Sequence, residues 1–323
     1  MPVPPAPDFL ARLRPGPPLV LDAAMGTDLL ARGALLPAPL WSVRALLDAP
    51  DLVEAIHREN ADAGADVLTI ASFRLHGRNL RRSSCSLSQG ELLARAVNAA
   101  RRAGREEKIS LKGEEGAQQG RSAARPSEPP THPSKKILNS PWIAGSLAPL
   151  EDCYRPDLVP KQNEILLSEH AEMAAALAAA GVDLILVETM NTVREAAAST
   201  RGAAATGLPV VVSCVTDGNG RLLSGEPVED FARALLLLPS PPDALGVNCV
   251  AARSLAGDLA RLAAAAPGVP LAAYGNTFGD PVAPKDYAAL AAEWVTLGAR
   301  LVGGCCGTTA AHTAAVAGLI YGK

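Results

Sequence analysis

The sequence predicts an α/β protein built as a single (β/α)8 TIM-type barrel, and two observations carry this prediction. Strand-length apolar runs alternate with helix-length segments eight times along the 323 residues, and no two runs are joined as a hairpin. The runs are apolar throughout, as expected of parallel strands that are covered on both faces. We therefore expect one domain over residues 1–323.

The first four units can be placed from apolar spacing and helix ends. A strand at residues 19–22 ends in a carboxylate and leads through a loop to a helix from residue 28. A helix at 51–63 reaches Gly64, a typical helix-ending residue, before a strand at 66–72. A helix at 91–101 precedes the strand at 142–146. A helix at 163–180, closed by Gly181, precedes the strand at 182–188.

The alternation continues through the second half of the chain. We expect helices at 194–205, 228–238, 254–265 and 284–297, and strands at 208–213, 244–249, 270–274 and 299–302. The last strand runs into a turn where two adjacent cysteines stand between glycines. Glycine tolerates positive φ and close backbone approach, so this turn presents two thiols at a strand end.

Composition excludes several classes of partner. Apolar residues make up 48% of the chain and charged residues 20%, enough for a sizeable core. The formal net charge of -3 offers no electrostatic case for nucleic acid or a membrane surface. No uncharged apolar run reaches membrane-spanning length, and residues 1–18 are proline-rich rather than signal-like. We expect a cytoplasmic protein whose six cysteines are reduced.

One segment interrupts the alternation. Residues from about 104 to 139 are rich in Gly, Ser, Pro, Gln, Lys and Glu and carry few large apolar side chains. Such a composition cannot bury enough surface to order itself, so we expect a disordered insert between the second helix and the third strand. It should hang from the N-terminal face of the barrel, because it follows a helix and precedes a strand.

Polar side chains and thiols gather where the predicted strands end. The chemistry of such barrels lies on the loops after the strands, so these residues should meet in space. They are Asp22, Thr69, Ser72, Phe73, Glu188, Asn248, Cys249, Cys305 and Cys306.

Three of the six cysteines therefore belong to one rim. The neighbouring Cys305 and Cys306 could be small buried apolar residues, and a disulfide between them would be strained. With Cys249 as a third thiolate and an open fourth position, they instead match a catalytic zinc site, for which sulfur ligands are well suited. We take the other three cysteines, at positions 85, 153 and 214, as structural.

Three segments then carry a resemblance to a known family. Residues 22–27, 246–249 and 303–308 resemble the signature segments of the zinc-dependent homocysteine S-methyltransferases, and residues 40–42, 144–149 and 187–189 also look like family segments. The resemblance implies a (β/α)8 barrel and Zn2+ on Cys249, Cys305 and Cys306. It implies homocysteine as methyl acceptor, with Asp22 and Glu188 near its amino group.

The chain also departs from the family pattern. Ile70 stands where members commonly carry threonine, Ala23 or Ala24 replaces a glycine, and the segment from Tyr274 to Thr277 differs from the family form. Asn276 is a further candidate contact to the substrate. The Leu40-Trp41-Ser42 segment looks most like the branch that uses S-methylmethionine, with betaine as runner-up and methylfolate as a third donor.

A cationic donor would gain from aromatic faces, for which Phe73, Trp41, Trp142 and Tyr154 are candidates. For Trp142 we favour core packing. Two other classes of function stay open, a zinc hydrolase and a non-catalytic zinc- or thiol-binding barrel. The hydrolase is disfavoured because no histidine falls at a predicted strand end. We expect the histidines at 57, 76, 170 and 312 on exposed helices or loops.

Overall fold

The computed structural model describes residues 7–14, 16–104 and 140–322, which form one parallel sheet surrounded by helices. The sheet has eight strands in the order β1-β8-β7-β6-β5-β4-β3-β2, and every pairing is parallel. The strands are β1 (Leu19–Val20), β2 (Val67–Thr69), β3 (Trp142–Leu147), β4 (Leu184–Met190), β5 (Val210–Cys214), β6 (Ala244–Ala251), β7 (Leu271–Asn276) and β8 (Ala299–Gly304).

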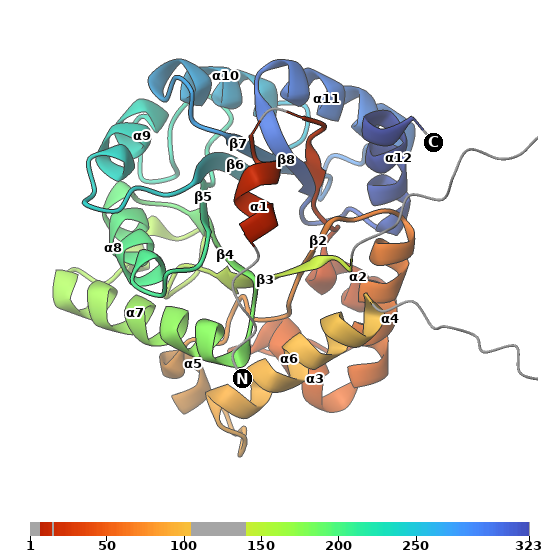
Figure 1. Cartoon of the computed structure of the whole chain (residues 1–323). Helices are drawn as coiled ribbons and strands as arrows, with labels where there is room; N and C mark the ends of the chain where they lie inside the picture. Colours follow the sequence, from red (N-terminus) through yellow and green to blue (C-terminus); the bar gives the residue numbers. More distant parts are fainter. Residues whose placement is uncertain (1–6, 15, 105–139, 323) are drawn as a thin grey trace, which may run out of the picture.

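The sheet closes on itself between its first and second strands. Leu21 forms a parallel bridge with Val67, and the amide of Asp66 donates to the carbonyl of Val20 at 2.7 Å. Closure leaves no sheet edge, and the helices surround the ring of strands in the view along its axis (Figure 1). The predicted (β/α)8 barrel is confirmed.

Each predicted helix is present, with ends that differ by a few residues. Gly181 ends one of them in the left-handed conformation, as expected. The long helices are α2 (Met25–Ala31), α4 (Pro50–Asp62), α6 (Gln89–Ala103), α7 (Asn163–Ala180), α8 (Val193–Ala204), α9 (Val228–Leu236), α10 (Leu255–Ala265), α11 (Pro284–Thr296) and α12 (Ala310–Tyr321). The sequence analysis did not predict α12, nor the short elements α1 (Pro7–Arg12), η1 (Trp41–Arg44), α3 (Ala45–Asp48), α5 (Gly77–Arg81) and η2 (Pro156–Leu158).

The strand residues alternate between two cores. Leu184 and Leu186 point into the barrel and pack with Leu19 and Leu21, whereas Ile185 belongs to the layer between sheet and helices. Both sets are fully or almost fully buried. This two-sided burial explains why the strands read as continuous apolar runs.

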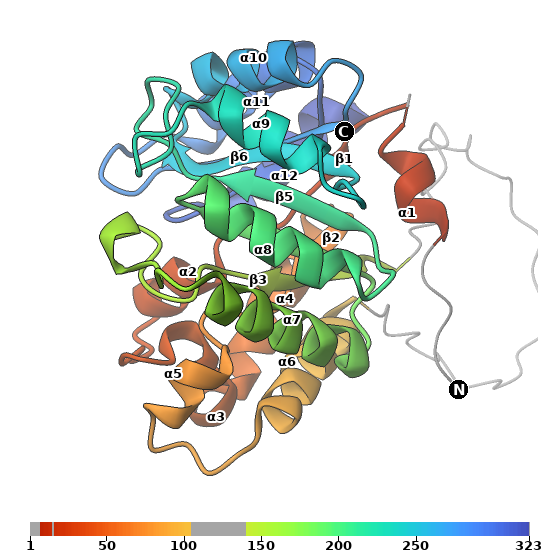
Figure 2. The same cartoon turned by 90° about the vertical axis from the view of Figure 1, so that its left-hand side faces the viewer.

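Helix α1 covers one end of the barrel. Phe9 and Leu13 are buried in the interior core, and the Phe9 ring meets the edge of Trp142 with 5.7 Å between ring centroids. Figure 1 shows α1 across the barrel axis, and Figure 2 shows it at one end, beyond the strands. The expected core-packing role of Trp142 is confirmed.

The predicted insert, from about 104 to 139, lies outside the described residues except for Gly104. Gly104 is the residue that caps the end of α6. The chain on its two sides is close in space, because a Cβ on Gly104 would lie 3.0 Å from Cδ of Pro141. The described chain therefore resumes beside the end of α6. Among the described residues, no helix combines the length and apolar character needed to cross a membrane.

Candidate active site

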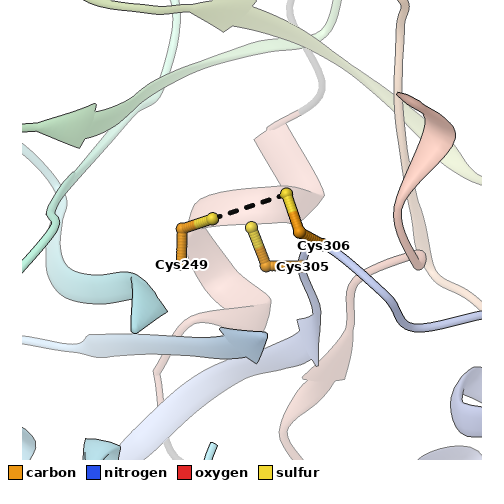
Figure 3. Close-up of side chains that lie close together, drawn as sticks. All are labelled: Cys249, Cys305 and Cys306. Atoms are coloured by element: carbon orange, nitrogen blue, oxygen red, sulfur yellow. Dashed lines mark hydrogen bonds between the residues drawn. The ribbon is translucent and has the colours of Figure 1, made fainter. Parts of the chain in front are cut away.

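Three sulfur atoms converge at the carboxyl end of the barrel. Cys249 lies in β6, and Cys305 and Cys306 follow β8 directly. The three Sγ atoms lie within 4.8 Å of one another, and the Sγ atoms of Cys249 and Cys306 are 3.6 Å apart. Figure 3 shows the three side chains turned toward a common point. The structure thus brings together the three cysteines that the sequence analysis placed on one rim.

The spacing suits a tetrahedral metal ion. With zinc–sulfur bonds of about 2.3 Å, two sulfur ligands of such an ion lie about 3.8 Å apart. The separation of Cys249 and Cys306 is close to this value. Three soft sulfur donors favour zinc over magnesium or calcium, so both the geometry and the chemistry of the donor set fit.

The backbone of Cys249 is held in an unusual conformation. Its φ is 54°, a left-handed value that is rare outside glycine, and β6 shifts its register against β7 between Asn248 and Ala251. The Asn276 side chain donates to the carbonyl of Cys249 at 2.7 Å. Asn276, considered as a substrate contact, thus holds the peptide that presents this thiol.

The three thiols differ in the direction of their pKa shifts. Hydrogen bonds from Cys305 and then Cys306 lower the pKa of Cys249 well below its ordinary value. The same contacts raise the pKa of Cys305 well above the ordinary value, and that of Cys306 also lies above it. These directions make Cys249 the most acidic thiol of the cluster, because its two neighbours donate to its ionised form.

A fourth polar group touches the cluster. Tyr154 lies on the loop after β3, and its hydroxyl is 3.1 Å from Sγ of Cys249. The backbone amide of Tyr154 donates to Oδ1 of Asp152 at 2.8 Å, which fixes the start of this side chain. The sequence analysis listed Tyr154 only among possible aromatic faces. Its contact with the sulfur could not be predicted, because it depends on how the loop folds.

Asp22 and Thr69 form a pair at the ends of the first two strands. The amide and hydroxyl of Thr69 donate to the two carboxyl oxygens of Asp22 at 2.7 and 2.9 Å. Burial raises the pKa of Asp22 to about 8, against the lowering effect of these hydrogen bonds. Thr69 therefore orients the Asp22 carboxyl group.

Glu188 is the second buried carboxyl group. Ser146 donates a short hydrogen bond to it, and burial raises the pKa of Glu188 to about 7, opposed by hydrogen bonds that include Tyr274. The Ser72 hydroxyl in turn accepts from the amide of Ser146 at 3.1 Å. Ser72 thus supports the residue that contacts Glu188.

Asn248 is fully buried beside these groups. Its amide oxygen accepts from the amide of Thr189 at 2.9 Å, and its amide nitrogen donates to the Thr189 hydroxyl at 2.8 Å. Thr189 has a φ of 61°, so the reciprocal pair stabilises a second left-handed residue at the rim. In this arrangement Asn248 ties β4 to β6.

A cavity of about 470 Å3 joins these residues. Of the residues predicted for the site, Ser72 and Asn248 lie behind the wall of this cavity. Those that line it are Asp22, Thr69, Phe73, Glu188, Cys249, Cys305 and Cys306. Trp41, Tyr154 and Ile70 line it as well, and Trp41 meets Phe73 edge to face with 6.4 Å between centroids.

The histidine expectation was wrong. His57 and His170 are fully buried, and His76 and His312 are 1% and 8% exposed. The side chain of His57 lies on the inner side of α4, and burial lowers its pKa to about 4. Helical spacing shows which residues share a face, but a lone histidine does not reveal that its face is turned to the sheet.

Sequence reasoning missed two polar residues of the site. Ser146 and Tyr274 both line the cavity, and the Tyr274 hydroxyl also bonds to Ser213. Both stand in strands whose apolar character dominates. Their positions at the carboxyl ends of β3 and β7 were the signal that could have identified them.

Comparison with known proteins gives a consistent result. Residues 19–320 match the family model described as homocysteine S-methyltransferase. Homocysteine S-methyltransferase 4 of Zea mays is 30% identical over 92% of this chain and 88% of its own length. The homocysteine S-methyltransferase of Escherichia coli (strain K12) is 30% identical over 92% of this chain and 94% of its own length.

A solved structure agrees with these sequence relatives. The metallated form of the homocysteine methyltransferase MmuM from Escherichia coli superposes with a TM-score of 0.75 and 28% identity. The match covers 95% of this chain and 98% of that one.

Proposed function

This chain belongs to the homocysteine S-methyltransferase family, and from that premise we propose that it transfers a methyl group from S-methylmethionine to the sulfur of L-homocysteine. The products are two molecules of methionine, one from each substrate. The observation that carries the proposal is the convergence of three cysteine sulfurs on a cavity that also holds two buried carboxyl groups and aromatic side chains.

We propose Zn2+ as the metal and Cys249, Cys305 and Cys306 as its ligands. The close sulfur spacing and the soft donor set support zinc. That a similar structure, MmuM, exists in a metallated form adds support for metal binding by this chain. When bound, the ion would keep the homocysteine sulfur deprotonated at neutral pH, where a free thiol with a pKa of about 8.5 is mostly protonated.

Asp22 and Glu188 would bind the ammonium group of homocysteine. Both carboxyl groups are buried, line the cavity and have a raised pKa in the unliganded protein. An adjacent cation favours the ionised form of each, so the substrate compensates the charge that burial disfavours. Thr69 keeps Asp22 in place. Asn248, Ser72 and Phe73 complete the proposed set of substrate-binding residues, the first two through the groups that they position.

The transfer itself is a displacement at carbon. A carbon–sulfur bond of the donor sulfonium breaks, and its electron pair stays on the donor sulfur, which becomes a neutral thioether. A new bond forms between that methyl carbon and the homocysteine sulfur, whose thiol proton is released. The protein contributes by holding the two sulfurs in line with the methyl group and by keeping water away.

The aromatic wall supports a cationic donor. Trp41, Phe73 and Tyr154 line the cavity, and a sulfonium gains from aromatic faces. Trp41 is held at a φ of 49°, and a Cβ on Gly26 would come within 2.5 Å of its ring. Only glycine at position 26 leaves room for the indole in this place.

Steady-state assays on metal-loaded protein test the proposal. We expect methionine from homocysteine with S-methylmethionine, and little or none with betaine or methylfolate. Activity with betaine or methylfolate alone would overturn the choice of donor. Homocysteine binding without transfer from any donor would favour a non-catalytic thiol-binding protein. Metal analysis of the purified protein tests zinc separately.

A further inference from the structure

The outer part of the cavity carries charged side chains that the metal ligands and the two buried carboxyl groups do not engage. Arg74, Arg82, Glu151 and Asp152 all line it. The Glu151 carboxylate is already engaged, because it pairs with Arg78 and, at 3.0 Å, with Arg82. These salt bridges hold the loop after β3 to α5. Arg74 and Asp152 remain outside this network.

Arg74 and Asp152 are only loosely paired. Their closest nitrogen and oxygen are 3.8 Å apart, the longest ion pair that the described residues form. The Arg74 side chain makes no hydrogen bond with any described residue. Asp152 uses Oδ1 to accept from the amide of Tyr154, while Oδ2 faces Arg74. Both side chains are partly shielded from water, with 23% and 46% exposure.

These two charges stand next to the aromatic part of the cavity. Arg74 follows Phe73 in the chain, and Asp152 is bonded to the backbone of Tyr154. The hydroxyl at the far end of Tyr154 touches Sγ of Cys249. The Tyr154 side chain therefore spans the path from the cysteine cluster to Asp152. A molecule whose reactive end meets the cluster and whose body lies along Tyr154 brings its far end to Arg74 and Asp152.

We propose that Arg74 and Asp152 bind the amino-acid head of the methyl donor, the guanidinium its α-carboxylate and the Asp152 carboxylate its α-ammonium. This inference rests on the proposed function and names the donor's chemical class, an α-amino acid that bears a sulfonium. A guanidinium matches a carboxylate in a two-pronged arrangement, and the weak existing pair leaves both groups able to turn to a ligand. Betaine has a carboxylate but no N–H, so it could not donate a hydrogen bond to the Asp152 carboxylate.

Kinetics with two donors test the assignment. The first donor is S-methylmethionine, and the second is the dimethyl(propyl)sulfonium ion, which keeps the sulfonium but lacks the head. Arg74→Ala should raise the KM for S-methylmethionine about tenfold, the loss expected for one charge-assisted hydrogen-bonded contact. It should leave the homocysteine KM and the reaction with the headless donor within about twofold. Arg74→Lys should recover part of the loss, and Asp152→Asn should raise the same KM several-fold.

The matched control is Arg155→Ala. Arg155 lies on the same loop, pairs with Asp157 at the surface and does not line the cavity, so its removal should leave both donors unaffected. If Arg74→Ala slowed the reaction with both donors by the same factor, the Arg74 side chain would serve to hold the loop and not to bind the amino-acid head of the donor. The assignment would then be overturned. An effect of Arg82→Ala on the S-methylmethionine KM without one of Arg74→Ala would overturn it as well.

Calorimetric binding of S-methylmethionine separates this assignment from the proposed activity. Binding that weakens in Arg74→Ala and Asp152→Asn would support the subsite even if no methyl transfer occurred. If methyl transfer occurred but neither substitution changed the binding of S-methylmethionine, the proposed activity would stand and the proposed subsite would be wrong.

Discussion

The sulfur of Cys249 lies 3.6 Å from the sulfur of Cys306, although 57 positions separate the two residues in the chain. Barrel closure produces this contact, because β6 and β8 flank β7 and all three end at the same rim. The two sulfurs stand at a separation that a tetrahedral zinc ion would impose. The site can therefore accept the metal with little movement of either strand.

Removal of one of these thiols should abolish stoichiometric metal binding. We expect Cys249→Ser to lose its zinc, because two cysteine ligands do not hold the ion as three do. Metal content after gel filtration checks this. The control is Cys85→Ser, because Cys85 is half-buried and lies outside the cluster. Equal metal content in the two variants would contradict the ligand assignment.

The hydroxyl of Tyr154 should tune the metal site. Tyr154→Phe removes the group that lies 3.1 Å from Sγ of Cys249 while keeping the ring. Loss of such a supporting hydrogen bond typically lowers metal affinity about ten- to 100-fold. Competition with a chromogenic chelator measures the change. An unaltered affinity would show that the contact has no bearing on the metal.

The affinity for the product methionine should rise with pH up to about 8. Burial raises the pKa of Asp22 to about 8 and that of Glu188 to about 7, so both are partly protonated in the free protein at neutral pH. An ammonium group favours their ionised forms, and binding therefore releases protons below these values. Each released proton adds at most about tenfold in affinity per pH unit.

Methionine is the suitable probe for this pH dependence because it has no thiol proton of its own. Calorimetry between about pH 6 and pH 8, in buffers of different ionisation enthalpy, counts the protons released. Asp22→Asn should weaken binding and flatten the upper part of the dependence. A wild-type affinity that stays constant over this range would exclude the proposed role of the carboxyl groups.

A side chain at Gly246 should disturb the packing of β6 against β7. A Cβ at this position would lie 2.6 Å from the carbonyl oxygen of Ala272 and 2.8 Å from its Cβ, and the backbone atom cannot move aside cheaply. We expect Gly246→Ala to reduce the free energy of unfolding by about 1–3 kcal/mol. Urea denaturation measures this loss.

Gly257 offers the matched control. It lies within α10, and a Cβ there would meet no atom within 4 Å. Gly257→Ala should therefore stabilise the protein by up to about 1 kcal/mol, because alanine favours a helix over glycine. Destabilisation of both variants to the same degree would refute the steric argument.

Much of the site could be predicted because the barrel makes one rule sufficient. Residues at the ends of parallel strands share a rim, so Cys249 and the Cys305–Cys306 pair could be brought together without coordinates. The same rule brought Asp22 and Thr69 together, and the structure joins them by two hydrogen bonds. It could not show that the Asn248 amide is engaged by Thr189, since that depends on the bulged ends of β4 and β6.

The sequence by itself determined the order of strands and helices, the barrel and the residues that face its rim, because strand and helix periodicity are local properties of the chain. Only the tertiary structure decided which polar groups are partners across the rim, which histidines are buried, and which charges stay loosely paired. The partners across the rim depend on strand register, on the bulges at Cys249 and Thr189, and on the loop that carries Asp152 and Tyr154 back over the cavity. The burial of the histidines depends on which helix face is turned to the sheet. A difference of one residue in register would turn the side chains of a strand to its other face, and no local pattern encodes the register.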